Sequence, residues 1–249
     1  MIERQHRFRL KGCRPGRAFW ALPALFALSG CLDVPGGTPR VVGFTRAAPQ
    51  TIAVAGGAVV IGGPRGYCID RAGSRPGGET AFVLLGSCAS ISRNANAPAP
   101  DFPGVLTASV TRDSGAAPSG AAALQQLERY LASPEGRAML ARDGQASSVD
   151  ILETRLENGA IFIHLRDRSA NATDGLADTY WRALFLLNGR LITLSVFGAA
   201  RQPLSDETGL ATARGFLARI RRESQSAVAA IAPADAAAPR KGLLLNLFE

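Results

Sequence analysis

Few residues of this chain are candidates for acid–base catalysis, and the strongest candidates lie in the strand-like stretch 149–167. His164 is one of only two histidines, and a histidine beside a carboxylate can act as a general base. The two-residue turn Asn158–Gly159 sets the register of a hairpin and places Glu153 directly across from His164. We interpret these two as a solvated cross-strand pair, because no nucleophile lies at a predictable reach. Asp167 would complete the alternative, a dispersed enzyme site.

Metal and cofactor chemistry find little support in the residue pattern. Beyond residue 30 the sequence holds a single histidine, His164, whereas the common zinc sites combine several His or Cys ligands. The glycines between Gly56 and Gly66 lack the Gly-Lys-Ser/Thr ending of a phosphate loop, so we interpret them as turns. The sequence therefore predicts no catalytic residue, no metal and no cofactor.

Residues 1–31 combine a basic start, a short apolar stretch and a cysteine. Ala18–Gly30 is shorter than the roughly 20 residues that a helix needs to cross a bilayer, so it is typical of a signal peptide. Its end, Leu28-Ser29-Gly30-Cys31, resembles the lipobox of bacterial lipoproteins. The resemblance implies that the Cys31 thiol is diacylated, that the leader is cut before Cys31 and that the new amine is then acylated, palmitate being one such acyl group. Cys31 would thus become the lipidated first residue. The alternative is an ordinary secretory leader with a chance cysteine.

The same resemblance predicts a location in the cell envelope, facing the periplasm. In enteric-type sorting an Asp after the lipidated cysteine favours the inner membrane, so Leu32 favours the outer membrane. Because exported proteins meet an oxidising compartment, we expect the remaining pair, Cys68 and Cys88, to form a disulfide bond. A redox or metal role would require a Cys-x-x-Cys spacing or nearby histidines, and the sequence around these cysteines has neither.

The formal net charge of +8 is concentrated in the leader. Residues 1–30 hold six of the 28 basic residues and one of the 20 acidic residues, which leaves +3 for the rest of the chain. Nucleic-acid binding needs a clustered basic face. The charge pattern therefore argues against a nucleic-acid partner.

Apolar periodicity predicts two hairpins and three helices in the second half of the chain. The hairpins are 149–157 with 160–167 and 179–187 with 190–197, each joined by Asn-Gly. In the first hairpin we expect an apolar face and a position near a sheet edge; this face comprises Leu152, Leu156, Ile161, Ile163 and Leu165. The second hairpin is apolar on both faces, which predicts a central position. Ser119, Ser133 and Ser205 are expected to cap the helices, and Gly144 to end the second.

These elements predict an α+β fold, an antiparallel sheet built from hairpins with a mid-chain helix pair and a C-terminal packing helix. Shorter strands are expected at 41–44, 51–54, 59–61, 82–85 and 105–111. The element order over 110–220 is similar to that of PsbP-like α/β/α domains. The predicted organisation is a signal peptide (1–30), a tether (31–40), the domain (41–223), an Ala/Pro-rich linker (224–240) and an apolar C-terminal peptide (241–249).

The C-terminal peptide carries large apolar side chains that the domain prediction does not use: Leu243, Leu244, Leu245, Leu247 and Phe248. They could dock on the protein's own domain, bind a partner protein of the envelope or touch the membrane. The function we predict is that of a lipid-anchored, non-catalytic binding or accessory protein of the bacterial envelope. The alternatives are an envelope enzyme with a dispersed site and a carrier of a small ligand.

Overall fold

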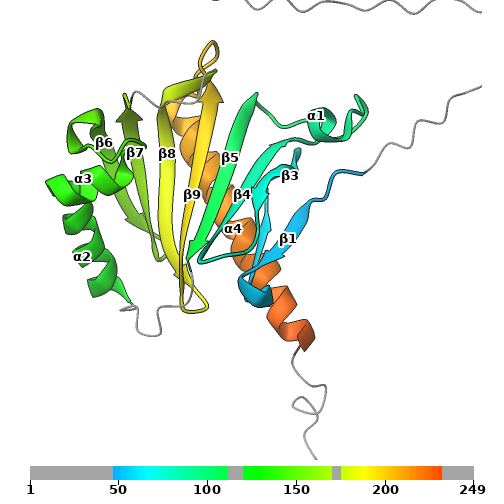
Figure 1. Ribbon diagram of the computed structural model, residues 1–249, viewed down its shortest axis with the longest axis horizontal. Coiled ribbons are helices and arrows are strands. Elements are labelled where there is room, and N and C mark those ends of the chain that lie inside the picture. Colours follow the sequence, from blue (N-terminus) through cyan, green and yellow to red (C-terminus); the bar gives the residue numbers. More distant parts are fainter. Residues whose placement is uncertain (1–46, 112–119, 170–174, 232–249) are drawn as a thin grey trace, which may run out of the picture. The chain divides into compact units, whose positions relative to one another are not determined.

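The computed structural model describes residues 47–111, 120–169 and 175–231, and its main feature is an antiparallel sheet of seven strands (Figure 1). The strands lie in the order β3-β4-β5-β9-β8-β7-β6, so the two hairpins predicted from Asn-Gly turns fill one half of the sheet. The bounds are β3 Tyr67–Arg75, β4 Thr80–Ser87, β5 Gly104–Thr111, β6 Val149–Glu157, β7 Ala160–Asp167, β8 Leu176–Leu187 and β9 Arg190–Ala199.

Helices cover both faces of this sheet and confirm the predicted α+β class. The long helix α4 (Asp206–Ile231) lies behind the sheet in Figure 1 and packs against β2 (Val59–Gly62), which pairs with β1 (Thr51–Val54). The pair α2 (Ala121–Ala132) and α3 (Pro134–Leu140) covers the opposite face near β6 and β7. The remaining short helices are α1 (Cys88–Ser92), η1 (Ala55–Gly57) and η2 (Ala146–Ser148).

The Asn-Gly turns produce the registers that they predict. Asn158 and Asn188 both adopt positive φ, and Glu157 pairs with Ala160 as Leu187 pairs with Arg190. The β8–β9 hairpin lies near the middle of the sheet, with α4 over one face and the helix pair over the other. The apolar pattern on both faces of this hairpin therefore reflects burial on both sides.

One residue of the first hairpin departs from its predicted place. The ladder between β6 and β7 is irregular between Ile151 and Glu153, so Leu152 has no partner across the strand. Ile151 takes the core-facing position opposite Leu165, while Leu152 is 46% exposed. A bulge adds one residue to a strand, so the side chains on its two sides no longer alternate in step. A prediction that assumes strict alternation therefore assigns part of the strand to the wrong face of the sheet. The prediction that Leu152 belongs to the buried face is therefore wrong.

The other edge strand, β3, also contains a bulge. Its pairing with β4 is irregular between Asp70 and Arg75. Within it, the Asp70 carboxylate accepts hydrogen bonds from the backbone of Ala72 and Gly73, and the Ser74 hydroxyl accepts one from the amide of Leu84. Side chains thus replace part of the regular backbone ladder at this edge.

Helix starts follow the predicted capping residues where the structure describes them. The Ser133 hydroxyl accepts a hydrogen bond from the Gly136 amide at the start of α3, and Ser205 accepts one from Thr208 at the start of α4. Ser119 lies outside the described residues, but the N-cap position of α2 is taken by Gly120, so the prediction that Ser119 caps this helix is wrong. The predicted end of α3 is too late, because the helix ends at Leu140 and the chain then forms the turn in which Gly144 has positive φ.

The linker predicted from residue 224 begins later than expected. α4 continues without a break to Ile231. Alanine has the highest helix propensity, and the Ser224 hydroxyl, fully buried, accepts a hydrogen bond from the Val60 amide of β2. This contact and the alanines extend the helix through a stretch whose apolar periodicity is weak.

Several predictions concern residues that the structure does not describe. They include the leader with Cys31, the tether, the strand expected at 41–44 and the peptide from Leu243 to Phe248. Among the helices of the described ranges, none is long and apolar enough to cross a membrane.

Trp181 offers an optical test of the core. It lies on β8, is 2% exposed and packs in the cluster formed with α4. We expect a blue-shifted fluorescence maximum from protein lacking the leader, since Trp20 is the one other tryptophan, and a red shift on unfolding in urea. Red-shifted emission from the folded protein would contradict the burial of β8 beneath α4.

Candidate functional site

The described surface is hollowed between the helix pair and the β6–β7 hairpin. A hollow of about 580 Å³, here called the α3 hollow, has a floor of apolar side chains from both elements. Glu128, Arg137 and Asp150 stand around this floor. The apolar floor consists of Leu131, Val149, Ile151, Ile161 and Ile163. Apolar floors with a few charged groups at the rim are typical of binding sites.

A second hollow of about 480 Å³ lies at the other end of α2, beside the β6–β7 turn. Its apolar lining comes from Leu124 of α2, Leu156 of β6 and Leu186 of β8. Asn158 and Gly159 contribute the turn itself. We call this the turn hollow. α2 thus has a hollow at each end, and Leu131 is its one buried residue.

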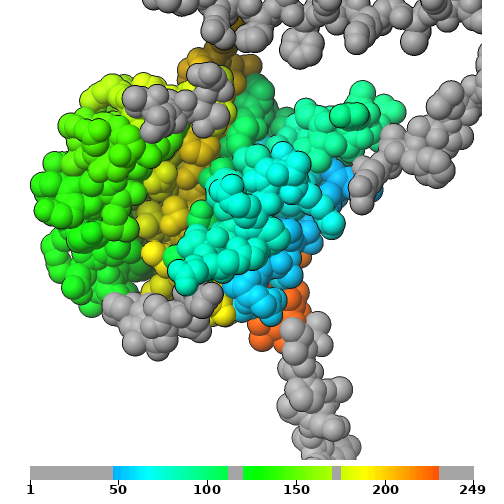
Figure 2. Space-filling view, viewed as in Figure 1, coloured from blue at the N-terminus to red at the C-terminus, as the bar shows by residue number. Residues whose placement is uncertain are grey.

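Most of the exposed large apolar side chains of the described residues lie on α2, α3 and β6, the elements that form these hollows, and Leu156 lines the turn hollow itself. Tyr130 of α2, Met139 of α3 and Leu156 of β6 are 42%, 64% and 39% exposed, and Leu152 lies on the same strand as Leu156. The one other large apolar residue that is exposed in the described part of the chain is Val228, on α4. Figure 2 shows α2, α3 and β6 in green along one side of the molecule. A local concentration of exposed apolar surface is typical of an interaction site.

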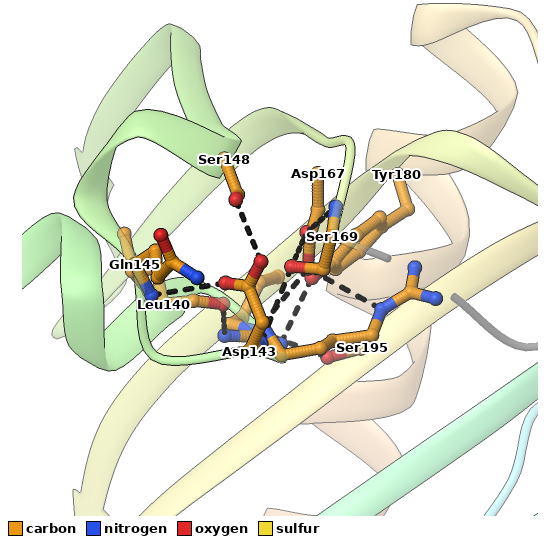
Figure 3. A network of polar contacts seen from close by, with 10 residues as sticks. Leu140, Asp143, Gln145, Ser148, Asp167, Ser169, Tyr180 and Ser195 are labelled. Carbon is orange, nitrogen blue, oxygen red and sulfur yellow. Dashed lines mark hydrogen bonds and ion pairs between the residues drawn. The ribbon is translucent and has the colours of Figure 1, made fainter. Parts of the chain in front are cut away.

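A buried polar cluster fixes the end of α3 to the sheet, and Figure 3 shows its side chains converging from the α3–β6 connection and from β7 to β9. The Asp167 side chain is fully buried. It accepts hydrogen bonds from the backbone amide and hydroxyl of Ser169 and from the Arg142 amide, and the Arg142 Nε lies 3.3 Å from its carboxylate. Asp167 therefore neutralises Arg142 and positions the chain segment after α3.

Arg182 provides the second half of this cluster. Its guanidinium donates to the Leu140 carbonyl at the end of α3, to the Ser195 hydroxyl of β9 and to the Tyr180 hydroxyl. Arg142 and Arg182 each lie 5.4 Å from the centre of the Tyr180 ring, and burial raises the pKa of the Tyr180 hydroxyl. The cluster holds α3 at one end of the α3 hollow, so it supports the site without lining it.

The structure does not bring the predicted acid–base residues together. Glu153 and His164 are paired in register, as predicted, but Glu153 binds Arg155 at 2.6 Å. His164 is 7% exposed and stacks on Trp181 with ring centres 4.8 Å apart. The interpretation of His164 as part of a solvated pair is therefore wrong. His164 pairs directly with Trp181 of the neighbouring strand β8. The imidazole ring therefore lies on the face of the sheet that α4 covers.

Asp167 lies on the opposite side of the sheet from His164. Residues 164 and 167 differ by an odd number of positions along β7, so their side chains point to opposite faces. The His164 Nε2 is instead 3.6 Å from a carboxylate oxygen of Asp206, in the first turn of α4. Glu153, His164 and Asp167 therefore cannot act on one substrate atom.

The predicted disulfide bond between Cys68 and Cys88 is confirmed. It joins the start of β3 to the start of α1, and both cysteines are buried. Within the described ranges no cluster of His, Cys, Asp and Glu side chains could hold a metal ion.

Sequence reasoning missed the polar cluster and both hollows. Arg182 carried a usable signal, because a charged residue inside the apolar run Trp181–Leu187 requires polar partners when that strand is central. The hollows had no such signal, since they depend on where α2 lies over the sheet.

Comparison with protein-family models, curated proteins and solved structures found no match to this chain. The functional conclusions therefore rest on the residues and their geometry. The resemblance to PsbP-like domains remains a prediction.

A pair of ionic contacts ties α4 to the wall of the turn hollow and predicts a pH effect. Arg214 donates two hydrogen bonds to Glu157, at 2.7 and 2.9 Å, and these hold the pKa of Glu157 below its ordinary value. The pair should stabilise the fold above the unfolded-state pKa of about 4.3 and stop doing so as the pH falls through the lower folded-state value. Both side chains are partly exposed, so the effect should be small.

Urea unfolding of the native protein and Arg214→Gln across pH 2–7 measures this contribution. We expect the variant to be less stable at neutral pH and the difference to vanish at the acid end. A difference that persists there would assign the effect of Arg214 to packing.

Proposed function

We propose that the protein is a lipid-anchored binding or accessory protein of the bacterial envelope, facing the periplasm, which holds a partner protein at the α3 hollow. Support for export comes from the lipobox resemblance at Cys31 and from the buried Cys68–Cys88 bond, since such bonds are typical of oxidising compartments. Leu32 favours the outer membrane. Several acyl chains at Cys31 would make the attachment effectively permanent.

One observation carries the binding role: exposed apolar side chains lie on α2, α3 and β6, the elements that also form an apolar hollow. A partner that inserts apolar side chains beside Ile151 would meet α3 and β6, on which Met139 and Leu152 are exposed. Arg137 and Asp150 at the rim would select its orientation through their opposite charges. The polar cluster keeps α3 in place, so the surface is formed before the partner arrives.

The experiment is a crosslinked pull-down from native membranes with three forms of the full-length protein. The first is native, the second carries Met139→Glu and Leu152→Glu, and the third carries Val228→Glu as a control. Val228 is 50% exposed and lies on α4. Its substitution therefore also replaces an exposed apolar side chain by a carboxylate, but away from α2, α3 and β6. We expect the double variant to lose a partner that the native form and the control both retain. Equal capture by all three would refute the site.

The anchor is tested separately, by mass spectrometry of the N-terminal peptide and by membrane fractionation. We expect a diacylated cysteine at position 31, and we expect Cys31→Ser to leave the protein uncleaved and without acyl groups. A mature chain that begins elsewhere would show an ordinary secretory leader.

The dimensions of the two hollows favour one alternative, a carrier of a small ligand, because ligand pockets commonly enclose about 300–1,000 Å³. A ligand that co-purifies with the protein and is lost from Thr154→Arg, a half-buried position that lines the α3 hollow, would support it. For an envelope enzyme, His164→Ala should abolish function; in a binding protein it should leave partner capture intact.

A further inference from the structure

We propose that the apolar C-terminal segment Leu243–Phe248 docks into the turn hollow of its own chain. The proposal concerns a hollow distinct from the one assigned to the partner, so it does not depend on the proposed function. It names one occupant, a segment that continues from α4. The argument rests on the reach of the chain, on the lining of the hollow and on charge.

The course of α4 brings the chain past the turn hollow before it reaches this segment. Arg221 donates hydrogen bonds to the carbonyls of Asn158 and Gly159, at 2.5 and 3.1 Å, and these two residues line the hollow. Arg214 binds Glu157, which also lines it. The C-terminal half of α4 is therefore attached to the wall of the proposed site.

The length of the spacer suits the distance that must be covered. From Arg221 to Ile231 the helix rises about 15 Å. The spacer 232–242 can extend to about 36–40 Å, more than twice that rise. A linker that can span two sites gives the tethered segment a high effective concentration at the second site. Docking within one chain is therefore favoured over docking between two copies.

The lining of the hollow suits an apolar peptide. Leu156 is 39% exposed, and Leu124 and Leu186 are half-buried. Burying these side chains together with the four leucines and the phenylalanine of the segment removes apolar surface from water on both sides. Glu157 supplies a carboxylate within the lining, and the basic pair Arg240 and Lys241 directly precedes the segment.

Photo-crosslinking in the full-length protein tests the proposal. A photoreactive amino acid replaces Phe248, and the crosslinked peptides are mapped by mass spectrometry. We expect crosslinks within the same chain to 120–125, 156–159 or Leu186, at a yield independent of protein concentration. Leu156→Glu should reduce the yield at least about tenfold, because it puts an unpaired charge in the apolar site. Val228→Glu, on α4 and outside the residues that line the hollow, should leave the yield unchanged.

Each other product would overturn the proposal. Crosslinks to a different protein would make the segment a partner-binding peptide, crosslinks to lipid would make it a membrane contact, and concentration-dependent crosslinks would place it on a second copy. A second variant, Leu244→Glu with Leu247→Glu, changes the segment and not the hollow, and should give the same tenfold loss if the proposal holds. The partner pull-down with Met139→Glu and Leu152→Glu reports on the α3 hollow, so either proposal can fail alone.

Discussion

Replacing Asp167 with asparagine should lower the free energy of unfolding by about 3–5 kcal/mol, the usual result of removing one partner of a buried ion pair. The Asp167 carboxylate is fully buried and accepts hydrogen bonds from Ser169 and from the Arg142 amide. Asparagine has almost the same volume but no charge. It would leave the Arg142 guanidinium without the only carboxylate that lies within ion-pair distance of it among the described residues.

Urea unfolding of Asp167→Asn, followed by circular dichroism, measures this effect. The control is Asp150→Asn on the neighbouring strand, whose carboxylate is 2.6 Å from Arg168 but lies at the surface. We expect the control to change stability little, because exposed ion pairs contribute little. If the two variants behaved alike, the buried cluster would have no special role in holding α3. Because Arg142 comes directly after α3, amide exchange should also increase in α3 of Asp167→Asn.

Removing the Cys68–Cys88 bond should cost about 3 kcal/mol of stability. The bond closes a loop with a sequence separation of 20, and the chain-entropy estimate for a loop of this size is about 3 kcal/mol. For a domain of this length the melting temperature should fall by about 6–12 °C. Both cysteines are buried, so reduction should require partial opening of the start of β3.

Calorimetry of the native protein and of Cys68→Ala with Cys88→Ala, each with and without reductant, separates the bond from the side chains. We expect reductant to lower the melting temperature of the native protein and to leave the double variant unchanged. An equal shift in both would mean that reductant acts elsewhere, and no shift in either would argue against a stabilising bond.

Local chemistry made much of this fold predictable. Asn158–Gly159 and Asn188–Gly189 require positive φ, which suits two-residue turns and sets the register of four strands. Failures occurred where distant contacts decide the outcome. The bulge at Leu152 reverses the facing of part of β6, and the contact between Ser224 and Val60 extends α4 into a stretch with a linker-like composition.

The candidate site was far less predictable than the fold. The hollows depend on the position of α2 over the sheet, and the floor residues Ile151, Ile161 and Ile163 have the same sequence pattern as any buried strand. His164 attracted attention because histidine is rare in this chain, yet its place is determined by stacking on Trp181. The residue types indicated which side chains could take part in chemistry. Only the packing of the strands and helices showed which of those side chains are in contact.

The bulges at both outer strands have a consequence for protein quality. A regular outer strand presents unpaired amides and carbonyls on which another chain can add, and this is a common route to aggregates. Here β3 is interrupted between Asp70 and Arg75, and β6 between Ile151 and Glu153. Neither end of the sheet offers an uninterrupted template, so crowded copies of the protein should resist joining into a longer sheet.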